Sequence, residues 1–309
     1  MMSELDLINW LRKRLGGVNE QILVGLGDDA AVIKWASDRK LVITTDMMLE
    51  GTCFLAEHGM RRIGRKALAI NLSDLAAMAA EPIAAVVSLA LPRSLDLPAV
   101  QELYEGMLAL AEEFAMAIIG GDTNSWSGPL AINVAAIGRA GPYPVVRRKG
   151  AQPGDWLFVT GPLGGSILGK HLDFIPRVRE ALRLSHIVSL RAMIDISDGL
   201  ARDLHHLCQE SGCGAIIEEE HIPISSAAYA LRDGVSPLEH ALSDGEDFEL
   251  LFAVAPEEGK RLLQTQPLQD LDVILYPIGE CIPEGIYIRY RDGHLAHLPP
   301  LGYTHRFGN

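Results

Sequence analysis

The chain has 309 residues, of which 48% are hydrophobic, so it can bury a large core and has room for two domains. Its 27 basic and 40 acidic residues give a formal net charge of −13. A nucleic-acid partner is therefore not expected, because nucleic-acid binders present a basic face. An acidic protein that handles phosphates must bring in positive charge, and this favours a bound metal ion.

The cysteines and the N-terminal sequence bear on the cellular compartment. No Cys-x-x-Cys spacing occurs among the four cysteines, which are Cys53, Cys208, Cys213 and Cys281. We therefore expect neither a zinc site nor a disulfide framework. The first residues include Glu4 and Asp6 and form no apolar signal region. The longest apolar run, 83–91, is about half the length of a membrane span, so we expect a cytoplasmic protein without a membrane segment.

Helix-like and strand-like segments alternate through the first half of the chain. Apolar spacing and turn residues predict helices over 3–15, 74–80 and 96–115. In this prediction Ser73 caps the second helix. Short apolar runs bounded by turn residues predict strands over 30–34, 41–45, 83–91, 118–119 and 131–137.

A change of composition at 139–155 marks the expected domain boundary. This stretch is basic and rich in glycine and proline, and it separates two apolar regions. We expect one domain over 1–140 and a second over 149–309. The elements expected in the second domain are a strand over 156–160, a helix over 198–210 and a hairpin over 286–298. The hairpin would turn at Asp292-Gly293.

Aspartates recur directly after short apolar runs. Five such runs end in a small polar residue or glycine followed by an acid, at Asp28-Asp29, Asp46, Asp74, Asp122 and Asp195 with Asp198. If the runs are buried strands, the acids lie where strands leave the core, and ligands bind there in open α/β sheets. Gathered carboxylates repel one another unless a cation lies between them, and Mg²⁺ takes oxygen ligands together with substrate phosphates. The pattern predicts a metal–nucleotide site that serves phosphoryl transfer.

Each acid also has a purely structural explanation. Ser73-Asp74 and Ser197-Asp198 are good helix starts, because serine caps a helix and aspartate favours its dipole. Asp28-Asp29 fits a surface turn. Helix capping alone does not require five such acids, so we prefer the metal–nucleotide interpretation.

Three further motifs are candidates for phosphate binding. Gly120-Gly121-Asp122-Thr123 is expected to form a turn whose backbone N–H groups approach phosphate. Lys66 is a surface lysine by default and a candidate for facing phosphate, and Arg148 is a candidate for reaching a nucleotide between the domains. The segment 161–171 nearly matches a Walker A loop, but His171 stands where a serine or threonine should hold magnesium. We reject the Walker interpretation and expect a strand–turn–helix junction.

Taken in order, these segments resemble the thiamine-monophosphate kinases. This family belongs to a superfamily with aminoimidazole ribonucleotide synthetase, selenophosphate synthetase and a hydrogenase maturation protein. The resemblance covers nearly the whole chain, from 25–31 to 302–305. Its most specific stretches are Asn71-Leu-Ser-Asp-Leu-Ala-Ala-Met78 and Gly245-Glu-Asp-Phe-Glu-Leu250.

The resemblance implies a two-domain, synthetase-like α/β fold. The sheet of the N-terminal domain would meet its mate across a homodimer and complete a β-barrel. The C-terminal domain would be an α/β layer packed alongside. ATP would lie in the cleft, with Mg²⁺ ions that bridge its phosphates to the chain.

The resemblance also implies roles for individual residues. The metal ligands would be Asp29, Thr44, Thr45, Asp46, Asp74, Asp122, Asp195 and Asp198. Contacts to ATP would come from Gly121, Asp122, Arg148 and Ser197, and contacts to the acceptor from Cys53, Glu246 and Tyr303. Cys53 stands where such kinases usually have a histidine, and Asp244 stands where they usually have a glycine. Asp122, and Lys66 as a nearby cation, are expected to serve catalysis.

The expected reaction transfers the γ-phosphoryl group of ATP to thiamine monophosphate and gives thiamine diphosphate. The acceptor oxygen is already ionised near neutral pH, so no general base is required. One alternative is a superfamily relative that uses ATP on a different acceptor. The other is a nucleotide-binding regulator that has lost activity through Cys53 and Asp244.

Overall fold

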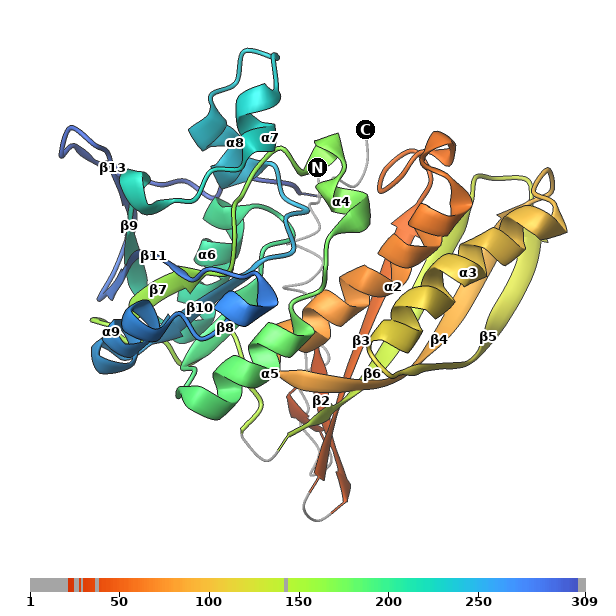
Figure 1. The fold of residues 1–309 in the computed structure, drawn as a ribbon, viewed down its shortest axis with the longest axis horizontal. Helices are drawn as coiled ribbons and strands as arrows, with labels where there is room; N and C mark the ends of the chain where they lie inside the picture. Colours follow the sequence, from red (N-terminus) through yellow and green to blue (C-terminus); the bar gives the residue numbers. More distant parts are fainter. Residues whose placement is uncertain (1–21, 25–27, 29, 37–38, 142–143, 305–309) are drawn as a thin grey trace.

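The structure is a computed structural model, and it describes residues 22–24, 28, 30–36, 39–141 and 144–304. The predicted helix over 3–15 and the candidate ligand Asp29 lie outside these residues. Helices and strands follow one another in two sets, each built around one sheet (Figure 1). The expected α/β fold class is confirmed.

The first sheet has six strands in the order β1-β2-β3-β6-β4-β5. Their bounds are β1 Ile22–Val24, β2 Ala31–Ala36, β3 Arg39–Leu49, β4 Ala80–Pro92, β5 Ala117–Trp126 and β6 Ala131–Ala140. Only β4 and β5 pair in parallel, and every other neighbouring pair is antiparallel. Two helices, α2 (Met60–Ala77) and α3 (Leu97–Glu113), cover one face (Figure 1). Burial alternates along β6, so the other face of the sheet stays partly exposed.

The second sheet has seven strands in the order β13-β12-β9-β11-β7-β10-β8. Their bounds are β7 Trp156–Val159, β8 Ala192–Asp195, β9 Gly214–Glu218, β10 Leu250–Val254, β11 Tyr276–Ile282, β12 Ile286–Arg289 and β13 Leu295–His297. The helices around it are α4 Lys170–Asp173, α5 Val178–Ile187, α6 Leu200–Ser211, α7 Ser226–Ala230, α8 Pro237–Ser243 and α9 Pro256–Thr265. Single 3₁₀ turns occur at η1 Ala56–His58, η2 Ser166–Leu168, η3 Glu219–His221 and η4 Gln269–Leu271.

A shared hydrophobic core joins the two sheets. The buried side chains of α2, among them Leu68, Leu72 and Leu75, belong to the same core as Phe158 and Phe252 of the second sheet. The rings of Phe158 and Phe252 stack with 5.5 Å between their centroids. A separate core fills the opposite face of the second sheet under α6. The helix α2 is therefore packed between both halves of the molecule.

The helix α2 also packs closely on α3. A side chain at Gly64 would lie 1.9 Å from the carbonyl oxygen of Leu103, and one at Gly106 would lie 1.9 Å from that of Arg61. Glycine at both positions lets the two backbones approach, which fixes the position of α2 on its sheet.

Two of the predicted elements are wrong. The helix predicted over 74–80 is the end of the much longer α2, and Ser73 lies inside that helix instead of capping it. Its hydroxyl donates to Asp195 across the core, which explains why a polar residue is buried there. The predicted turn at 120–123 is part of the strand β5, which pairs with β4 over its whole length.

The other predicted elements that fall on described residues are confirmed, several of them with longer bounds. The strands over 30–34, 41–45, 83–91 and 131–137 are β2, β3, β4 and β6, and the helix over 96–115 is α3. The helix over 198–210 is α6 (Leu200–Ser211), and the left-handed Gly212 follows it. The strands β12 and β13 pair antiparallel as the predicted hairpin. No helix among the described residues is long and apolar enough to cross a membrane.

Candidate active site

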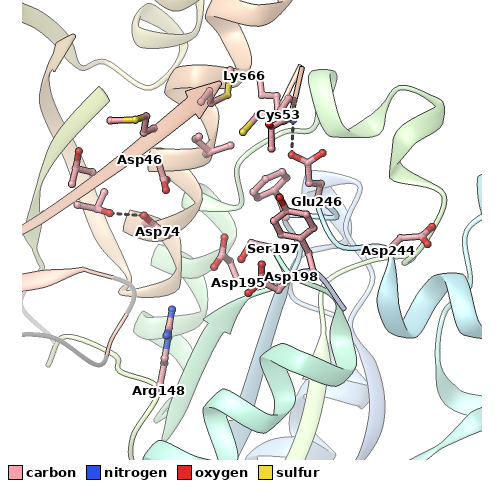
Figure 2. Close-up of a pocket in the computed structure, with 18 residues that line it drawn as sticks. Asp46, Cys53, Lys66, Asp74, Arg148, Asp195, Ser197, Asp198, Asp244 and Glu246 are labelled. Atoms are coloured by element: carbon pink, nitrogen blue, oxygen red, sulfur yellow. Dashed lines mark hydrogen bonds and ion pairs between the residues drawn. The ribbon is translucent and has the colours of Figure 1, made fainter. Parts of the chain in front are cut away.

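A cavity of about 490 Å³ opens where the first sheet meets the loops of the second. Figure 2 shows side chains from both halves pointing into it. The first half contributes Thr44, Thr45, Asp46, Met47, Met48, Thr52, Cys53, Lys66, Ile70 and Asp74. The second half and the crossing to it contribute Arg148, Asp195, Ser197, Asp198, Asp244, Glu246, Phe248 and Tyr303.

Four of the predicted acids meet in this cavity. Asp46 lies on β3, Asp74 on α2, Asp195 at the end of β8, and Asp198 in the loop before α6. Hydroxyl groups orient two of them: Thr44 donates to Asp74, and Ser73 donates to Asp195 at 2.6 Å. The expectation that each acid follows the end of a strand is wrong for Asp46 and Asp74, because β3 continues through Asp46 to Leu49 and Asp74 is helical. It is also wrong for Asp122, because β5 continues through Asp122 to Trp126. Tertiary packing, and not a common sheet edge, brings the acids together.

The negative charge of this group affects the pKa of a buried acid beside it, Asp203. Asp203 in the first turn of α6 accepts hydrogen bonds from the backbone N–H groups of Asp198 and Gly199, both at 3.1 Å. Burial raises the pKa of Asp203 well above its usual value, and the nearby charges of Asp198 and Asp195 raise it further. Asp203 was not among the predicted site residues, although an acid in the first turn of a predicted helix is a typical capping residue.

Lys66 and Glu246 join the two halves at the other end of the cavity. The Lys66 ammonium is buried, and it donates to the Cys53 carbonyl at 2.7 Å and to Glu246 Oε1 at 2.5 Å. The Glu246 side chain is 37% exposed, so it keeps access to the cavity. Lys66 is therefore not a solvated surface lysine. It holds in place the acid that the family resemblance assigns to the acceptor.

The loop that carries Glu246 has an unusual backbone. Glu246 and Phe248 both have left-handed φ angles, of 53° and 50°, which non-glycine residues rarely adopt. The backbone N–H of Glu246 donates to the Ser197 carbonyl at 2.7 Å, and that of Phe248 donates to the Ile196 carbonyl at 2.8 Å. The Phe248 ring also stacks on Phe174 with 4.0 Å between centroids. Backbone strain held by surrounding contacts is typical of functional sites.

Two further acids of the same loop have opposite protonation behaviour. Burial raises the pKa of Asp247 to about 7, although its carboxylate accepts from the Gly164 N–H at 3.0 Å. Burial also acts to raise the pKa of Glu249, but the charges of Lys170 and Arg177 outweigh it and lower that pKa to about 2. Lys170 and Arg177 both donate hydrogen bonds to the Glu249 carboxylate and so hold it in its charged form.

Hydrogen bonds hold the chain segment around Arg148 to both halves of the molecule and the segment around Tyr303 to the second half. The Arg148 N–H donates to Asp28 at 2.5 Å, and its carbonyl accepts from the Ser211 hydroxyl at 2.8 Å. The Tyr303 N–H donates to the Asp198 carbonyl at 3.0 Å. These bonds place both side chains at the cavity, as Figure 2 shows for Arg148.

The donor atoms at the acid end are suited to a hard cation. They are carboxylate oxygens from Asp46, Asp74, Asp195 and Asp198, with the hydroxyl of Thr44 beside them. Oxygen donors of this kind select Mg²⁺ over softer metals. The Thr45 hydroxyl points elsewhere, toward Asn133 and the carbonyl of Val134 on β6 at 3.2 and 3.1 Å.

Similarity to known proteins shows the family of this chain. Residues 27–140 match the family described as AIR synthase related protein, N-terminal domain, and residues 152–291 match AIR synthase related protein, C-terminal domain. The thiamine-monophosphate kinase of Rhodopirellula baltica is 44% identical over 98% of this chain and 97% of its own length. The chain belongs to the thiamine-monophosphate kinase family. The Escherichia coli K12 member is 33% identical over 98% of each chain.

A solved structure from the thiamine-monophosphate kinase family has the same fold. AaThiL complexed with AMPPCP and TMP is similar at a TM-score of 0.84, with 29% sequence identity, and the match covers 99% of this chain and 97% of that one. The similarity therefore includes both sheets and the region of the cavity between them.

Two departures from the thiamine-monophosphate kinase pattern lie at the cavity. Cys53 lines it and offers its carbonyl to Lys66. The Asp244 carboxylate accepts from the Gly165 N–H at 2.7 Å and lies 2.9 Å from His240 Nδ1. These contacts hold Asp244 toward α8, at a distance from the acid group in Figure 2.

Gly121 and Asp122 do not line the cavity of their own chain. They lie on the exposed edge strand β5, and the register across the sheet runs from Asp122 through Ser88 and Asn133 to Met47. Three strand spacings, roughly 14 Å, separate Asp122 from Met47. Glycine is required at 121, because a side chain there would lie 1.8 Å from the Val87 carbonyl oxygen.

Proposed function

We propose that this protein transfers the γ-phosphoryl group of ATP to thiamine monophosphate, which gives thiamine diphosphate and ADP. The observation that carries this proposal is the cavity itself, with four carboxylates at one end and an ion-paired glutamate beside aromatic side chains at the other. It lies in a chain whose relatives bear the name thiamine-monophosphate kinase over nearly their full length. ATP as donor implies a cytoplasmic reaction.

The acid end is proposed to hold Mg²⁺ with the phosphates of ATP. Asp46, Asp74, Asp195 and Asp198 would be the ligands, assisted by Thr44; Asp29 and Thr45 remain candidates from the family resemblance. Bound Mg²⁺ supplies positive charge that neutralises the phosphate oxygens. Arg148 and Ser197, at the same end, would contact ATP, and Arg148 adds a cation of the chain's own.

The other end is proposed to bind thiamine monophosphate. Its thiazolium ring is cationic, and a partly exposed carboxylate with aromatic neighbours suits a cation of this shape. Glu246, Phe248 and Tyr303 supply these groups. Lys66 would position Glu246, and Cys53 would form part of the wall.

The chemical step requires alignment more than proton transfer. An ionised phosphate oxygen of the acceptor attacks the γ-phosphorus, a new P–O bond forms, and the bond to the β-phosphate oxygen breaks as ADP leaves. Because the attacking oxygen carries no proton near neutral pH, the chain has only to bring two anions into line and exclude water.

We also propose that the active protein is a homodimer that packs through the uncovered face of its first sheet. Met47 and Leu49 of β3 are 62% and 42% exposed on that sheet, which suits burial against a second copy. A second copy would also provide a use for Asp122, which lies on the same exposed side as Met47, and for its neighbour Gly121. In this arrangement the partner's β5 would bring its Asp122 to the cavity. The boundary between domains 1–140 and 149–309 remains part of this proposal.

Purified protein with Mg–ATP and thiamine monophosphate tests the reaction directly. Chromatography should show thiamine diphosphate in a one-to-one ratio with ADP, and EDTA should abolish both products. ATP binding without any thiamine diphosphate would overturn the proposal and favour the regulator. ADP formed only with another phosphate acceptor would favour a different substrate.

Heterodimers test whether the site is shared. Co-expression of Asp74→Asn and Asp122→Asn chains with different tags allows isolation of the mixed dimer. If one site needs both chains, one of its two sites is intact and the mixed dimer keeps about half of wild-type activity. If each site lies within one chain, both sites carry a mutation and the mixed dimer is as inactive as either parent. A monomer by sedimentation analysis would contradict the dimer.

A further inference from the structure

Three of the four cysteines gather at the far end of α6, away from the cavity. Cys208 lies in the last turn of α6, Cys213 follows the helix, and Cys281 lies on β11. Cys208 and Cys281 are buried, Cys213 is half-buried, and all three are free thiols. We name these three residues the thiol cluster. The 12 residues of α6 span about 18 Å, so the thiol cluster is well separated from Asp198.

The end of α6 brings Cys208 and Cys213 together. Gly212 adopts a left-handed conformation with φ of 69°, and the Cys213 N–H donates to the Cys208 carbonyl at 3.1 Å. At a helix end of this type the side chains at these two positions commonly pack on each other. The backbone of the helix end therefore fixes this contact.

The second sheet brings Cys281 to the same place. Cys281 pairs with Ala215 across β9 and β11, and Ala215 is two residues beyond Cys213. Side chains two residues apart in extended chain point to the same side. Cys208 and Cys281 belong to the core under α6, and Cys213 packs against that core. Two thiols thus flank Cys213.

The contacts make Cys213 the reactive member of the thiol cluster. Cys213 is the member of the thiol cluster that solvent reaches, since Cys208 and Cys281 are buried. Interaction with Cys208 and with Cys281 lowers the pKa of its thiol below the usual value. The same interactions, with burial, raise the pKa of Cys208 and of Cys281. A partly exposed thiolate is the form of cysteine that peroxides oxidise, and a neighbouring thiol converts the product to a disulfide.

The arrangement of the sulfur atoms does not suit a metal cage. Within the described part of the chain, the three metal-ligand side chains whose donor atoms all lie within 4.8 Å of one another are Asp198, Asp203 and His206. The thiol cluster is not such a group, so its three sulfur atoms do not all lie within 4.8 Å of one another. Cys213 interacts with both Cys208 and Cys281, which favours exchange between neighbouring sulfur atoms.

We propose that the thiol cluster is a site of reversible oxidation by hydrogen peroxide, with Cys213 oxidised first and Cys208 or Cys281 as its disulfide partner. The Cys213 sulfur attacks one peroxide oxygen, the O–O bond breaks, and hydroxide leaves behind a sulfenic acid. The flanking thiol then attacks the Cys213 sulfur, the S–S bond forms, and the sulfenic oxygen leaves as water. Two thiols are oxidised, and one peroxide is reduced to two waters. A dithiol reductant restores both thiols.

Peptide mapping of the full-length protein tests this proposal. The protein is treated with hydrogen peroxide, quenched with N-ethylmaleimide, and digested for mass spectrometry. We expect Cys213 to appear in a disulfide with Cys208 or Cys281, to be oxidised at least about tenfold faster than Cys53, and to be recovered with dithiothreitol. The linkage should be absent from untreated protein.

Single and double variants identify the partner. In Cys208→Ala the linkage to Cys281 should persist, and in Cys281→Ala the linkage to Cys208 should persist. In the double variant no disulfide to Cys213 should form, and its oxidation should be slower because both thiols that lower its pKa are absent; dimedone should trap the sulfenic acid that does form. Circular dichroism melting verifies that each variant is folded, and the mapping of wild-type protein stands independently of them.

Two results would overturn the proposal. One is a Cys213 that stays reduced at a peroxide dose that oxidises Cys53. The other is a Cys208–Cys281 disulfide that forms in Cys213→Ser as fast as any disulfide forms in the wild-type chain. Neither readout depends on kinase activity, so these experiments test the proposal independently of the proposed function.

Discussion

At one end of the cavity four carboxylates gather with hydroxyl donors, whereas at the other end a buried ammonium already holds the carboxylate of Glu246. The raised pKa of Asp203, caused by burial and then by Asp198 and Asp195, shows that negative charge accumulates at the acid end. At the other end, the negative charge of Glu246 is balanced by the positive charge of Lys66. Loss of a group at the acid end should therefore affect catalysis above all, while loss of Glu246 should also affect stability.

The largest effect is expected from Asp74→Asn. Loss of this charge removes a proposed Mg²⁺ ligand, and turnover should fall by roughly 10²- to 10³-fold, since such charge stabilisation contributes several kcal/mol. The melting temperature should change little, because the new amide oxygen can still accept from Thr44. Steady-state kinetics and calorimetry give the two values. Asp96→Asn is the matched control, because asparagine also caps α3 at this exposed position. Equal losses of turnover in both variants would contradict the assignment.

The next largest effect concerns Glu246→Gln. Without the Glu246 charge, the buried Lys66 ammonium keeps only weaker partners, and the free energy of unfolding should fall by about 2 kcal/mol. The KM for thiamine monophosphate should also rise. Urea unfolding measures the first effect and initial rates the second. Glu81→Gln breaks the exposed pair of Glu81 with Arg139 and should cost less than about 1 kcal/mol. If the two variants lose equal stability, the two ends of the cavity do not differ as described.

A smaller effect follows from the protonation of Asp247. Its folded-state pKa of about 7 lies above the usual carboxyl value, so its contribution to stability is complete in acid and is lost as pH rises toward 7. Asp247→Asn removes this loss. The stability of the variant relative to wild type should therefore increase between about pH 4 and 7, by on the order of 1 kcal/mol or more, and stay level above that. Urea unfolding across this pH range measures it. Asp292→Asn, at an exposed carboxyl, is the matched control, and a flat difference for Asp247→Asn would refute the assignment.

The smallest effect is expected from Asp244→Asn. The Asp244 carboxylate is already engaged with Gly165 and His240, so its charge should matter little to the acceptor. The KM for thiamine monophosphate should change by less than about tenfold, or 1.4 kcal/mol. A larger change would mean that Asp244 reaches the bound acceptor.

Local patterns in the sequence predicted most of the elements around the cavity. The apolar run 83–91 and the segment 198–210 predicted the strand β4 and the helix α6, because the spacing of apolar residues is a local property of the sequence. Ser73 was assigned wrongly for the same reason, since serine usually caps helices. Its buried hydroxyl is satisfied by Asp195, which lies 122 residues further along the chain. Local propensity contains no information about such a partner.

The site was harder to predict than the fold. The acids Asp46, Asp74, Asp195 and Asp198 were correctly expected to come together, because repeated carboxylates imply a shared cation. The ion pair between Lys66 and Glu246 joins residues 180 positions apart and depends on the strained loop around Glu246. The position of Asp122 on an outer strand follows from sheet order, which neither hydrophobic periodicity nor spacing determines.

The helix α2 carries both Lys66 and Asp74, so one continuous helix connects the two ends of the cavity. Eight residues separate them, a length of about 12 Å along the axis. The length of α2 between these two residues therefore sets the distance between the two bound substrates. One residue inserted between Lys66 and Asp74 would rotate one side chain relative to the other by about 100°. Such an insertion should be far more harmful than one of equal size in the β12–β13 hairpin.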